Sequence, residues 1–268
     1  MSKRIVVKIG TSTLMHQGGG VNLRNLDRLA RVLSDLKHAG NEIILVSSGA
    51  IGVGAGKMHM YTRPTELRMK QATAAIGQCE LMHLYDKLFG EYGVTVAQIL
   101  LIRENIDHPV QKQNLLGTMN ALLELGTVPV INENDSVSFD EIESEHKVFG
   151  DNDTLSAYVA QLCSADLLVL FSDIDGLYET DPHTDEDARL IAEVPEITEE
   201  IRALAGGAGT SFGTGGMVTK IRAAEIATAT GCDMIITNGS RPENLYDIAE
   251  GRARGTLFRA KKKGCVQR

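Results

Sequence analysis

Two lysines lie beside glycine-rich segments in an arrangement that suits phosphate binding. Lys8 belongs to the sequence KIGTST, in which Gly10 lets the backbone approach an anion and the hydroxyl side chains supply donors. Lys220 ends the sequence GGAGTSFGTGGMVTK, where a flexible glycine-rich segment precedes a helical pattern. Phosphoryl transfer needs positive charge against phosphate oxygens and little covalent chemistry from the protein. Each segment also has a simpler explanation. Lys8 could lie on an edge strand with its ammonium reaching solvent, and the glycine-rich segment before Lys220 could be a flexible surface linker.

A second glycine-rich segment, SSGAIGVGAGKM, follows the next apolar run. Ser47, Ser48 and Gly49 could offer successive backbone N–H groups at the start of a helix, which is an anion-binding arrangement. The segment does not fit GxxxxGK[ST], because no Ser or Thr follows Lys57, and it is a poor match to GxGxxG. A glycine-rich loop of this kind is weak support for a nucleotide site when it is taken alone.

The sequence INENDSV places four polar residues after an apolar run: Asn132, Glu133, Asn134 and Asp135. Amide and carboxylate groups together suit a zwitterionic ligand, with an acid for an ammonium and amides for a carboxylate. An ordinary turn explains the spacing equally well.

The sequence FGDNDTLSA places Asp151, Asn152 and Asp153 directly before Thr154, which we predict to be the N-cap of a helix. Carboxylates near a helix start favour the helix dipole. They could also orient the two lysines or hold a metal–nucleotide complex.

A further apolar run, DLLVLF, ends in SDIDGLYETDP, with Ser172 and Asp173 at its end. The acidic stretch resembles a calcium-binding EF-hand loop only loosely, because its glycine and terminal Glu positions do not match. A surface loop over a nucleotide is the preferred interpretation.

The elements that must position these residues alternate between short β-branched runs and longer amphipathic patterns. This alternation predicts right-handed βαβ units and a parallel sheet covered on both faces, with ligands at the carboxyl ends of the strands. The expected strands are residues 4–9, 42–46, 95–101, 127–131, 166–171 and 233–237. The expected helices are residues 23–39, 66–89, 110–125, 154–163 and 217–230.

Composition excludes several classes of function. A net charge of −8, an aromatic content of 4% and the absence of Trp argue against nucleic acid or an anionic membrane as the main partner. No run approaches the roughly 20 apolar residues of a membrane span, and Lys8 interrupts the only apolar run near the N-terminus. The four cysteines form no CxxC pair and the histidines show no zinc-binding spacing. We therefore expect a cytoplasmic enzyme, and the lysines favour a kinase that is neither P-loop nor protein-kinase-like.

Read in order, KIGTST, SSGAI, PVINEND, FGDNDTLSA, SDIDGLY and GTGGMVTK resemble the amino acid kinase family, and within it the kinases that phosphorylate L-glutamate. The resemblance runs from Arg4 to the GTLF sequence at residues 255–258. It implies an α/β fold, a three-layer αβα sandwich around a mostly parallel sheet. It also implies transfer of the ATP γ-phosphoryl group to the side-chain carboxylate of L-glutamate, the first step of proline biosynthesis. One small departure is Ser172, where a Thr commonly opens the motif.

The resemblance also implies residue roles. Lys8 and Lys220 would be the catalytic lysines, and Asp153 would hold both ammonium groups. The residues expected to bind glutamate are Ser48, Gly49, Ala50, Asn132, Asp135 and Asn152. The residues expected to line the ATP site are Gly10, Ser172, Asp173, Thr214, Gly215, Gly216, Met217 and Lys220.

Several wider expectations come from the same resemblance. Mg²⁺ would bridge the phosphates of ATP without a direct protein ligand. Proline would act as feedback inhibitor, the chain would form a homo-oligomer, and glutamyl phosphate reductase would be a partner. Residues 1–258 would form a single domain, with glutamate bound by the N-terminal half and ATP by the C-terminal half. Residues 259–268 would be a basic tail, and the C-terminal PUA module of many bacterial members would be absent.

Two rival functions remain open at this point. One is a sister kinase that acts on acetylglutamate, aspartate or uridylate, although the acidic acceptor region suits an acceptor with an ammonium. The other is a non-catalytic nucleotide-binding regulator on the same fold. The presence of both lysines and Asp153 argues against the regulator.

Overall fold

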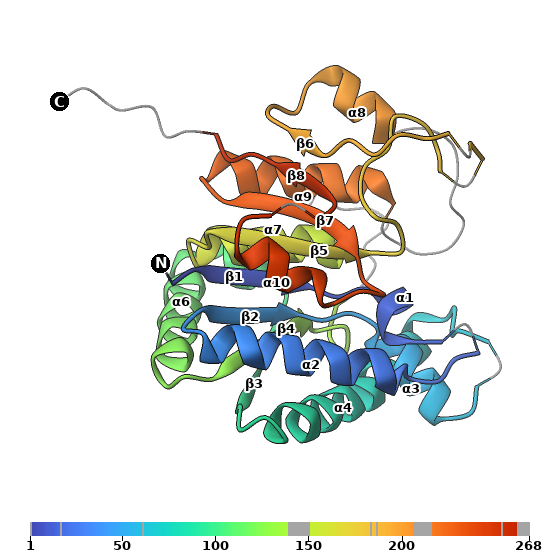
Figure 1. Ribbon diagram of the computed structural model, residues 1–268. Coiled ribbons are helices and arrows are strands. Elements are labelled where there is room, and N and C mark those ends of the chain that lie inside the picture. Colours follow the sequence, from blue (N-terminus) through green and yellow to red (C-terminus); the bar gives the residue numbers. More distant parts are fainter. Residues whose placement is uncertain are drawn as a thin grey trace.

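The structure is a computed structural model that describes residues 2–16, 18–60, 62–138, 151–182, 184–185, 187–205, 216–252 and 254–261. In these ranges a twisted sheet is enclosed between two layers of helices (Figure 1). The expected αβα sandwich is therefore confirmed. No helix within the described ranges is both long and apolar enough to cross a membrane.

The sheet has the strand order β3-β4-β2-β1-β5-β7-β8-β6. Every pair of neighbours is parallel except β7 and β8, so the sheet is mostly parallel. The strands are β1 (Arg4–Lys8), β2 (Glu42–Val46), β3 (Val96–Leu101), β4 (Val128–Glu133), β5 (Leu167–Ser172), β6 (Glu193–Val194), β7 (Asp233–Asn238) and β8 (Thr256–Phe258).

The helices pack on the two faces of the sheet. One face is covered by α2 (Leu23–His38), α3 (Ala50–Lys57), α4 (Leu67–Gly90) and α10 (Asn244–Ala249). The other is covered by α6 (Pro109–Glu124), α7 (Asn152–Leu162) and α9 (Met217–Ala229). Shorter helices are α1 (Thr11–Leu14), α5 (Glu104–Asp107) and α8 (Glu199–Ala205).

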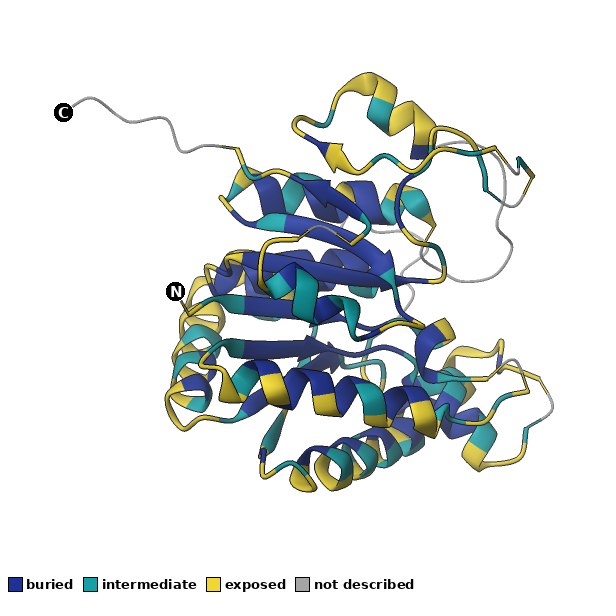
Figure 2. Ribbon diagram, in the orientation of Figure 1, coloured by how far each residue is buried: buried dark blue, intermediate teal, exposed yellow. Residues whose placement is uncertain are grey.

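Each strand contributes alternately to two apolar cores, one on each side of the sheet. In β1, Ile5 and Val7 belong to the core beneath α2 and α4, whereas Val6 belongs to the core beneath α7 and α9. The central strands are buried, the edge strands β3 and β6 are only partly buried, and the outer faces of the helices are exposed (Figure 2). Because side chains alternate along a strand, Lys8 lies on the same side as Val6 and faces α7 and α9.

The expected strands and helices agree with the structure to within a few residues. The glycine-rich segment after β2, at whose beginning we expected the start of a helix, forms the helix α3 with Gly49 as its N-cap. Strand β4 is longer than expected, and it includes Asn132 and Glu133. The short strands β6 and β8 were not predicted, because two or three residues show no periodicity.

Helices α3 and α4 cross with backbone against backbone. A Cβ atom on Gly77 would lie 1.8 Å from the Ala50 carbonyl oxygen, and one on Gly54 would lie 1.9 Å from the Thr73 carbonyl oxygen. The two glycines therefore permit the close approach that presses α4 against the start of α3.

We expect Gly77→Ala to lower the free energy of unfolding by about 1–3 kcal/mol, because the added methyl group forces the two helix backbones apart. Urea unfolding measures this change. The matched control is Gly117→Ala in α6, where a Cβ atom meets nothing within 4 Å. Alanine there favours the helix by up to about 1 kcal/mol. Equal stability of the two variants would show that the crossing tolerates a wider spacing.

Candidate active site

The carboxyl ends of β1, β2, β4 and β5 bring most of the predicted site residues to one edge of the sheet. Lys8 ends β1, Ser48 follows β2, Asn132 lies near the end of β4 and Ser172 ends β5. The strand order places them in the sequence Asn132, Ser48, Lys8 and Ser172 across the sheet. Helices α7 and α9 then add Asn152, Asp153 and Lys220 from the side.

The N-cap of α7 differs from the prediction. Asp151, not Thr154, is the capping residue, and its carboxylate accepts hydrogen bonds from the Thr154 backbone N–H at 2.8 Å and the Thr154 hydroxyl at 3.0 Å. The helix therefore begins at Asn152, so Asn152 and Asp153 lie in its first turn. Burial raises the pKa of Asp151.

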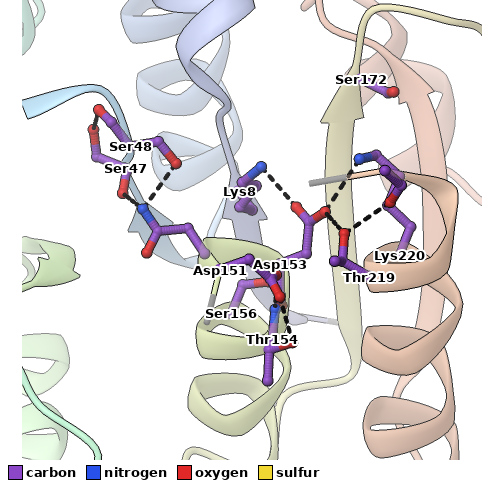
Figure 3. A network of polar contacts seen from close by, with 12 residues as sticks. Lys8, Ser47, Ser48, Asp151, Asp153, Thr154, Ser156, Ser172, Thr219 and Lys220 are labelled. Atoms are coloured by element: carbon purple, nitrogen blue, oxygen red, sulfur yellow. Dashed lines mark hydrogen bonds and ion pairs between the residues drawn. The ribbon is translucent and has the colours of Figure 1, made fainter. Parts of the chain in front are cut away.

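Asp153 lies between the two lysines (Figure 3). Lys8 Nζ forms an ion pair with Asp153 Oδ1 at 2.6 Å, and Lys220 Nζ contacts Asp153 Oδ2 at 3.1 Å. The three residues come from β1, α7 and α9, so the cluster exists only in the folded chain.

The Lys8–Asp153–Lys220 cluster is almost removed from solvent, with exposed fractions of 8%, 1% and 7%. Burial alone would raise the pKa of Asp153, but the ammonium groups of Lys8 and Lys220 outweigh it and hold this pKa below its ordinary value. The cluster therefore carries two positive charges and one negative charge. An excess positive charge in a site with little water is a strong attractor for a phosphate oxygen.

Thr219 also belongs to this cluster, and it lies within residues 214–220, which the resemblance placed along the ATP site. Its hydroxyl lies 3.0 Å from Asp153 Oδ2 and 2.8 Å from the Gly216 carbonyl oxygen. It lies next to Lys220 in the first turn of α9.

Asn152 is the centre of a second polar group. Its Nδ2 atom donates to the Ser47 carbonyl oxygen at 3.0 Å, to Ser48 Oγ at 2.8 Å and to Asn132 Oδ1 at 3.1 Å. A carbonyl oxygen can only accept, so the amide orientation is fixed. Asn152 Oδ1 is buried and has no partner in the described part of the chain. Among the described residues the Ser48 hydroxyl proton also has no acceptor, so this proton and Asn152 Oδ1 are available to a ligand.

Two buried residues support this amide group from α4, and the sequence analysis identified neither. Gln78 Oε1 accepts from Asn132 Nδ2 at 2.9 Å, and the Tyr85 hydroxyl lies 2.8 Å from Ser47 Oγ. Gln78 shares the buried side of α4 with Ala74 and Leu81. A polar residue at an apolar helical position was the available signal.

The other residues predicted to bind glutamate are Gly49, Ala50 and Asp135, and each is near Ser48 or Asn132 in the sequence. Gly49 is the N-cap of α3 with a φ of 86°, a left-handed conformation that favours glycine, and Ala50 begins the helix. The Ser47 N–H donates to the Ile131 carbonyl oxygen at 2.8 Å, so it is not one of the anion-binding N–H groups that we expected. Asp135 lies half-buried in the turn after β4.

The residues predicted to bind ATP are placed in part. The Ser172 hydroxyl donates to Asp173 Oδ1 at 3.0 Å, and both residues line a cavity of about 520 Å³. Its other lining residues are Ser12, Thr13, Asn22, Arg24, Asn25, Arg28, Asn238 and Ser240. Gly216 is the N-cap of α9 and Met217 begins it, while Gly10 is the N-cap of α1. Thr214 and Gly215 lie outside the described residues.

Comparison with known proteins shows which family and which relatives the sequence resembles. The model of the "Amino acid kinase family" matches residues 3–238. The chain is 54% identical to a protein of Clostridium perfringens named Glutamate 5-kinase, with 97% of each chain covered. It is 53% identical to a protein of the same name from Listeria innocua, covering 97% of this chain and 94% of that one.

Solved structures with lower identity share the architecture. Carbamate kinase from Giardia lamblia bound to AMP-PNP superposes with a TM-score of 0.68 at 18% identity, covering 97% of this chain and 99% of that one. UMP kinase from Ureaplasma parvum gives a TM-score of 0.64 at 13% identity, with the same coverage. At these identities the likeness concerns the fold alone.

Proposed function

The chain belongs to the amino acid kinase family, and we propose that it transfers the γ-phosphoryl group of ATP to the side-chain carboxylate of L-glutamate. The products are L-glutamyl 5-phosphate and ADP, and the reaction is the first step of proline biosynthesis. The observation that carries the proposal is the buried Lys8–Asp153–Lys220 cluster with its excess positive charge. The names of the relatives at 53–54% identity support glutamate as the acceptor.

In the proposed reaction, an oxygen of the glutamate side-chain carboxylate attacks the γ-phosphorus. The bond from that phosphorus to the oxygen bridging the β- and γ-phosphates breaks, and its electron pair leaves with ADP. Lys8 and Lys220 offset negative charge on the phosphoryl group during transfer, and Asp153 keeps the two ammonium groups in place. Stabilisation of this kind by fixed charges is a large part of phosphoryl-transfer catalysis.

The strand order suggests how glutamate lies in the site. Lys8 on β1 would face the reacting side-chain carboxylate, and the amino-acid head group would lie toward β2 and β4. Asn152 Oδ1 is a buried acceptor without a partner in the described ranges, and Asp135 adds a carboxylate nearby in the chain. These groups suit the α-ammonium. The Ser48 hydroxyl proton suits a carboxylate oxygen.

ATP is proposed to bind as its magnesium complex, with Mg²⁺ held by phosphate oxygens as part of the substrate. Across the described ranges, no three or more His, Cys, Asp or Glu side chains are grouped so that they could hold a metal ion. We propose that two parts of the chain contact the nucleotide. One is Ser172 and Asp173 at the end of β5, and the other is the start of α9.

We expect N-acetyl-L-glutamate to be a poor acceptor. Acetylation removes the ammonium, so acceptors such as Asn152 Oδ1 lose their charged donor, at a cost of about 1–3 kcal/mol. Steady-state rates of ADP release with each acceptor at equal concentration measure the discrimination. Aspartate, which is one methylene shorter, serves as the second comparison. Equal turnover of L-glutamate and N-acetyl-L-glutamate would favour a sister kinase instead.

Further family expectations are also proposals. Proline would share the head-group contacts of glutamate and inhibit competitively, which inhibition kinetics against glutamate can test. The product of the proposed reaction is an acyl phosphate, which a reductase such as glutamyl phosphate reductase would consume. A cytoplasmic location and a homo-oligomer, which light scattering can test, complete the proposal.

A further inference from the structure

Gln78 is a buried polar side chain at the edge of the proposed glutamate site. It lies on α4 directly after Gly77, where α4 presses against the start of α3. Only 8% of the residue is exposed. A carboxamide at such a position is costly unless its polar atoms have partners.

The polarity of the Gln78 side chain follows from its neighbours. The Glu133 backbone N–H donates to Asn132 Oδ1 at 2.9 Å, so Asn132 must present Nδ2 to Gln78. The Gln78 side chain therefore directs Oε1 toward Asn132, and its Nε2 group points away from Asn132. Nε2 has no hydrogen-bond partner among the described residues. It is also not completely shielded from solvent, so a ligand can reach it.

The position of Asn132 identifies the part of the acceptor that Gln78 would meet. Asn132 also contacts Asn152, whose neighbour in the chain, Asp153, binds Lys8. Lys8 lies two strands away from Asn132 in the sheet, on β1. The reacting carboxylate belongs beside Lys8, so the end near Asn132 is the amino-acid head group.

We propose that Gln78 is a specificity-determining residue that donates a hydrogen bond from Nε2 to the α-carboxylate of the acceptor amino acid. This inference rests on the proposed function. Asn132 holds the oxygen of Gln78, which leaves a buried and oriented donor for a negatively charged group. A hydrogen bond to a charged group is stronger than one between neutral groups, so a single donor can set the preference for a free α-carboxylate.

Two substitutions separate this role from a purely structural one. Gln78→Glu keeps an oxygen that accepts from Asn132 but replaces the donor with a negative charge, and Gln78→Met removes both functions at similar size. We expect each to raise the KM for L-glutamate about 10- to 100-fold, from the loss of a charged hydrogen bond. The KM for ATP should stay within about twofold, because ATP lies on the other side of Lys8.

The α-amide of L-glutamate gives a second readout. It keeps the reacting carboxylate but lacks the α-carboxylate charge, so the preference of the parent protein for L-glutamate over this amide should be largely lost in Gln78→Glu. Gln161→Glu is the matched control, because Gln161 is exposed at the far end of α7 and gains the same charge. Thermal unfolding verifies that each variant is folded.

Two results would overturn the inference while leaving the proposed function intact. One is a parental KM for L-glutamate in Gln78→Glu, with a defect only in Gln78→Met, which would show that Gln78 merely supports Asn132. The other is an equal rise in the KM values for ATP and glutamate. If the parent protein releases no ADP in response to L-glutamate, the proposed function fails, and the inference falls with it.

Discussion

Replacing either buried lysine with alanine is expected to lower kcat about 10²–10³-fold, with a much smaller change in the KM for glutamate. Lys8 and Lys220 both contact the Asp153 carboxylate, and their ammonium groups are held where phosphate charge would develop. An interaction that strengthens in the transition state lowers the barrier, whereas uniform binding does not. Steady-state kinetics with glutamate and ATP varied separately measure both parameters.

The controls for this experiment are two kinds of lysine substitution. Lys112→Ala removes an exposed lysine from α6 and should leave kcat unchanged. Lys8→Arg and Lys220→Arg should not restore the rate, because a planar guanidinium cannot take the place of a compact ammonium. Alanine variants within a few-fold of the parent rate would show that Lys8 and Lys220 do not act on the transferring group.

Asp153→Asn is expected to disturb both lysines at once. It should lower kcat by at least as much as one lysine substitution, and adding Lys8→Ala should cost less than it does in the parent. The neutral amide leaves two buried ammonium groups without a counter-charge, so the folded variant should lose about 3–5 kcal/mol of unfolding free energy. Urea unfolding and a double-mutant cycle in kcat measure the two effects.

Asp151→Asn is the matched control, because it changes the adjacent carboxyl group while asparagine remains a good N-cap for α7. We expect it to alter stability by less than about 1 kcal/mol. Additive losses in Asp153→Asn and Lys8→Ala would contradict a shared role for the two residues.

The pH dependence of stability provides a further check on Asp153. Its pKa is lowered in the folded protein, so its contribution is present above the unfolded value of about 3.9 and is lost as the pH falls through the folded value. The stability difference between the parent and Asp153→Asn should therefore be constant above about pH 5 and shrink below about pH 4.

Much of the fold was accessible from periodicity. Strands such as β1 and β5 have uninterrupted apolar centres, and amphipathic helices such as α2 alternate with the strands, so the sequence alone predicted a parallel sheet. The motif resemblance to the amino acid kinase family is confirmed by the family match and by the relatives. A helix start after Gly49 was expected, but the extent of α3 was not, because its glycines are poor helix formers, and their contact with α4 shows only in the fold.

Only part of the site could be predicted from the sequence. The rule that ligands bind at the carboxyl ends of parallel strands brought Lys8, Ser48 and Asn132 together correctly. Gln78 was missed because its partner, Asn132, is 54 residues away, and no local pattern links the two. The orientation of the Asn152 amide was also inaccessible, because the backbone carbonyl that fixes it lies 105 residues away.

The most direct test of the central proposal is to incubate the protein with Mg·ATP and L-glutamate, measuring ADP release and trapping the product with hydroxylamine. Hydroxylamine attacks an acyl phosphate and displaces phosphate to give a hydroxamate. The account predicts ADP release that requires L-glutamate, with one γ-glutamyl hydroxamate formed for each ADP. ADP release that is independent of glutamate, or that yields no hydroxamate, would contradict transfer to the side-chain carboxylate.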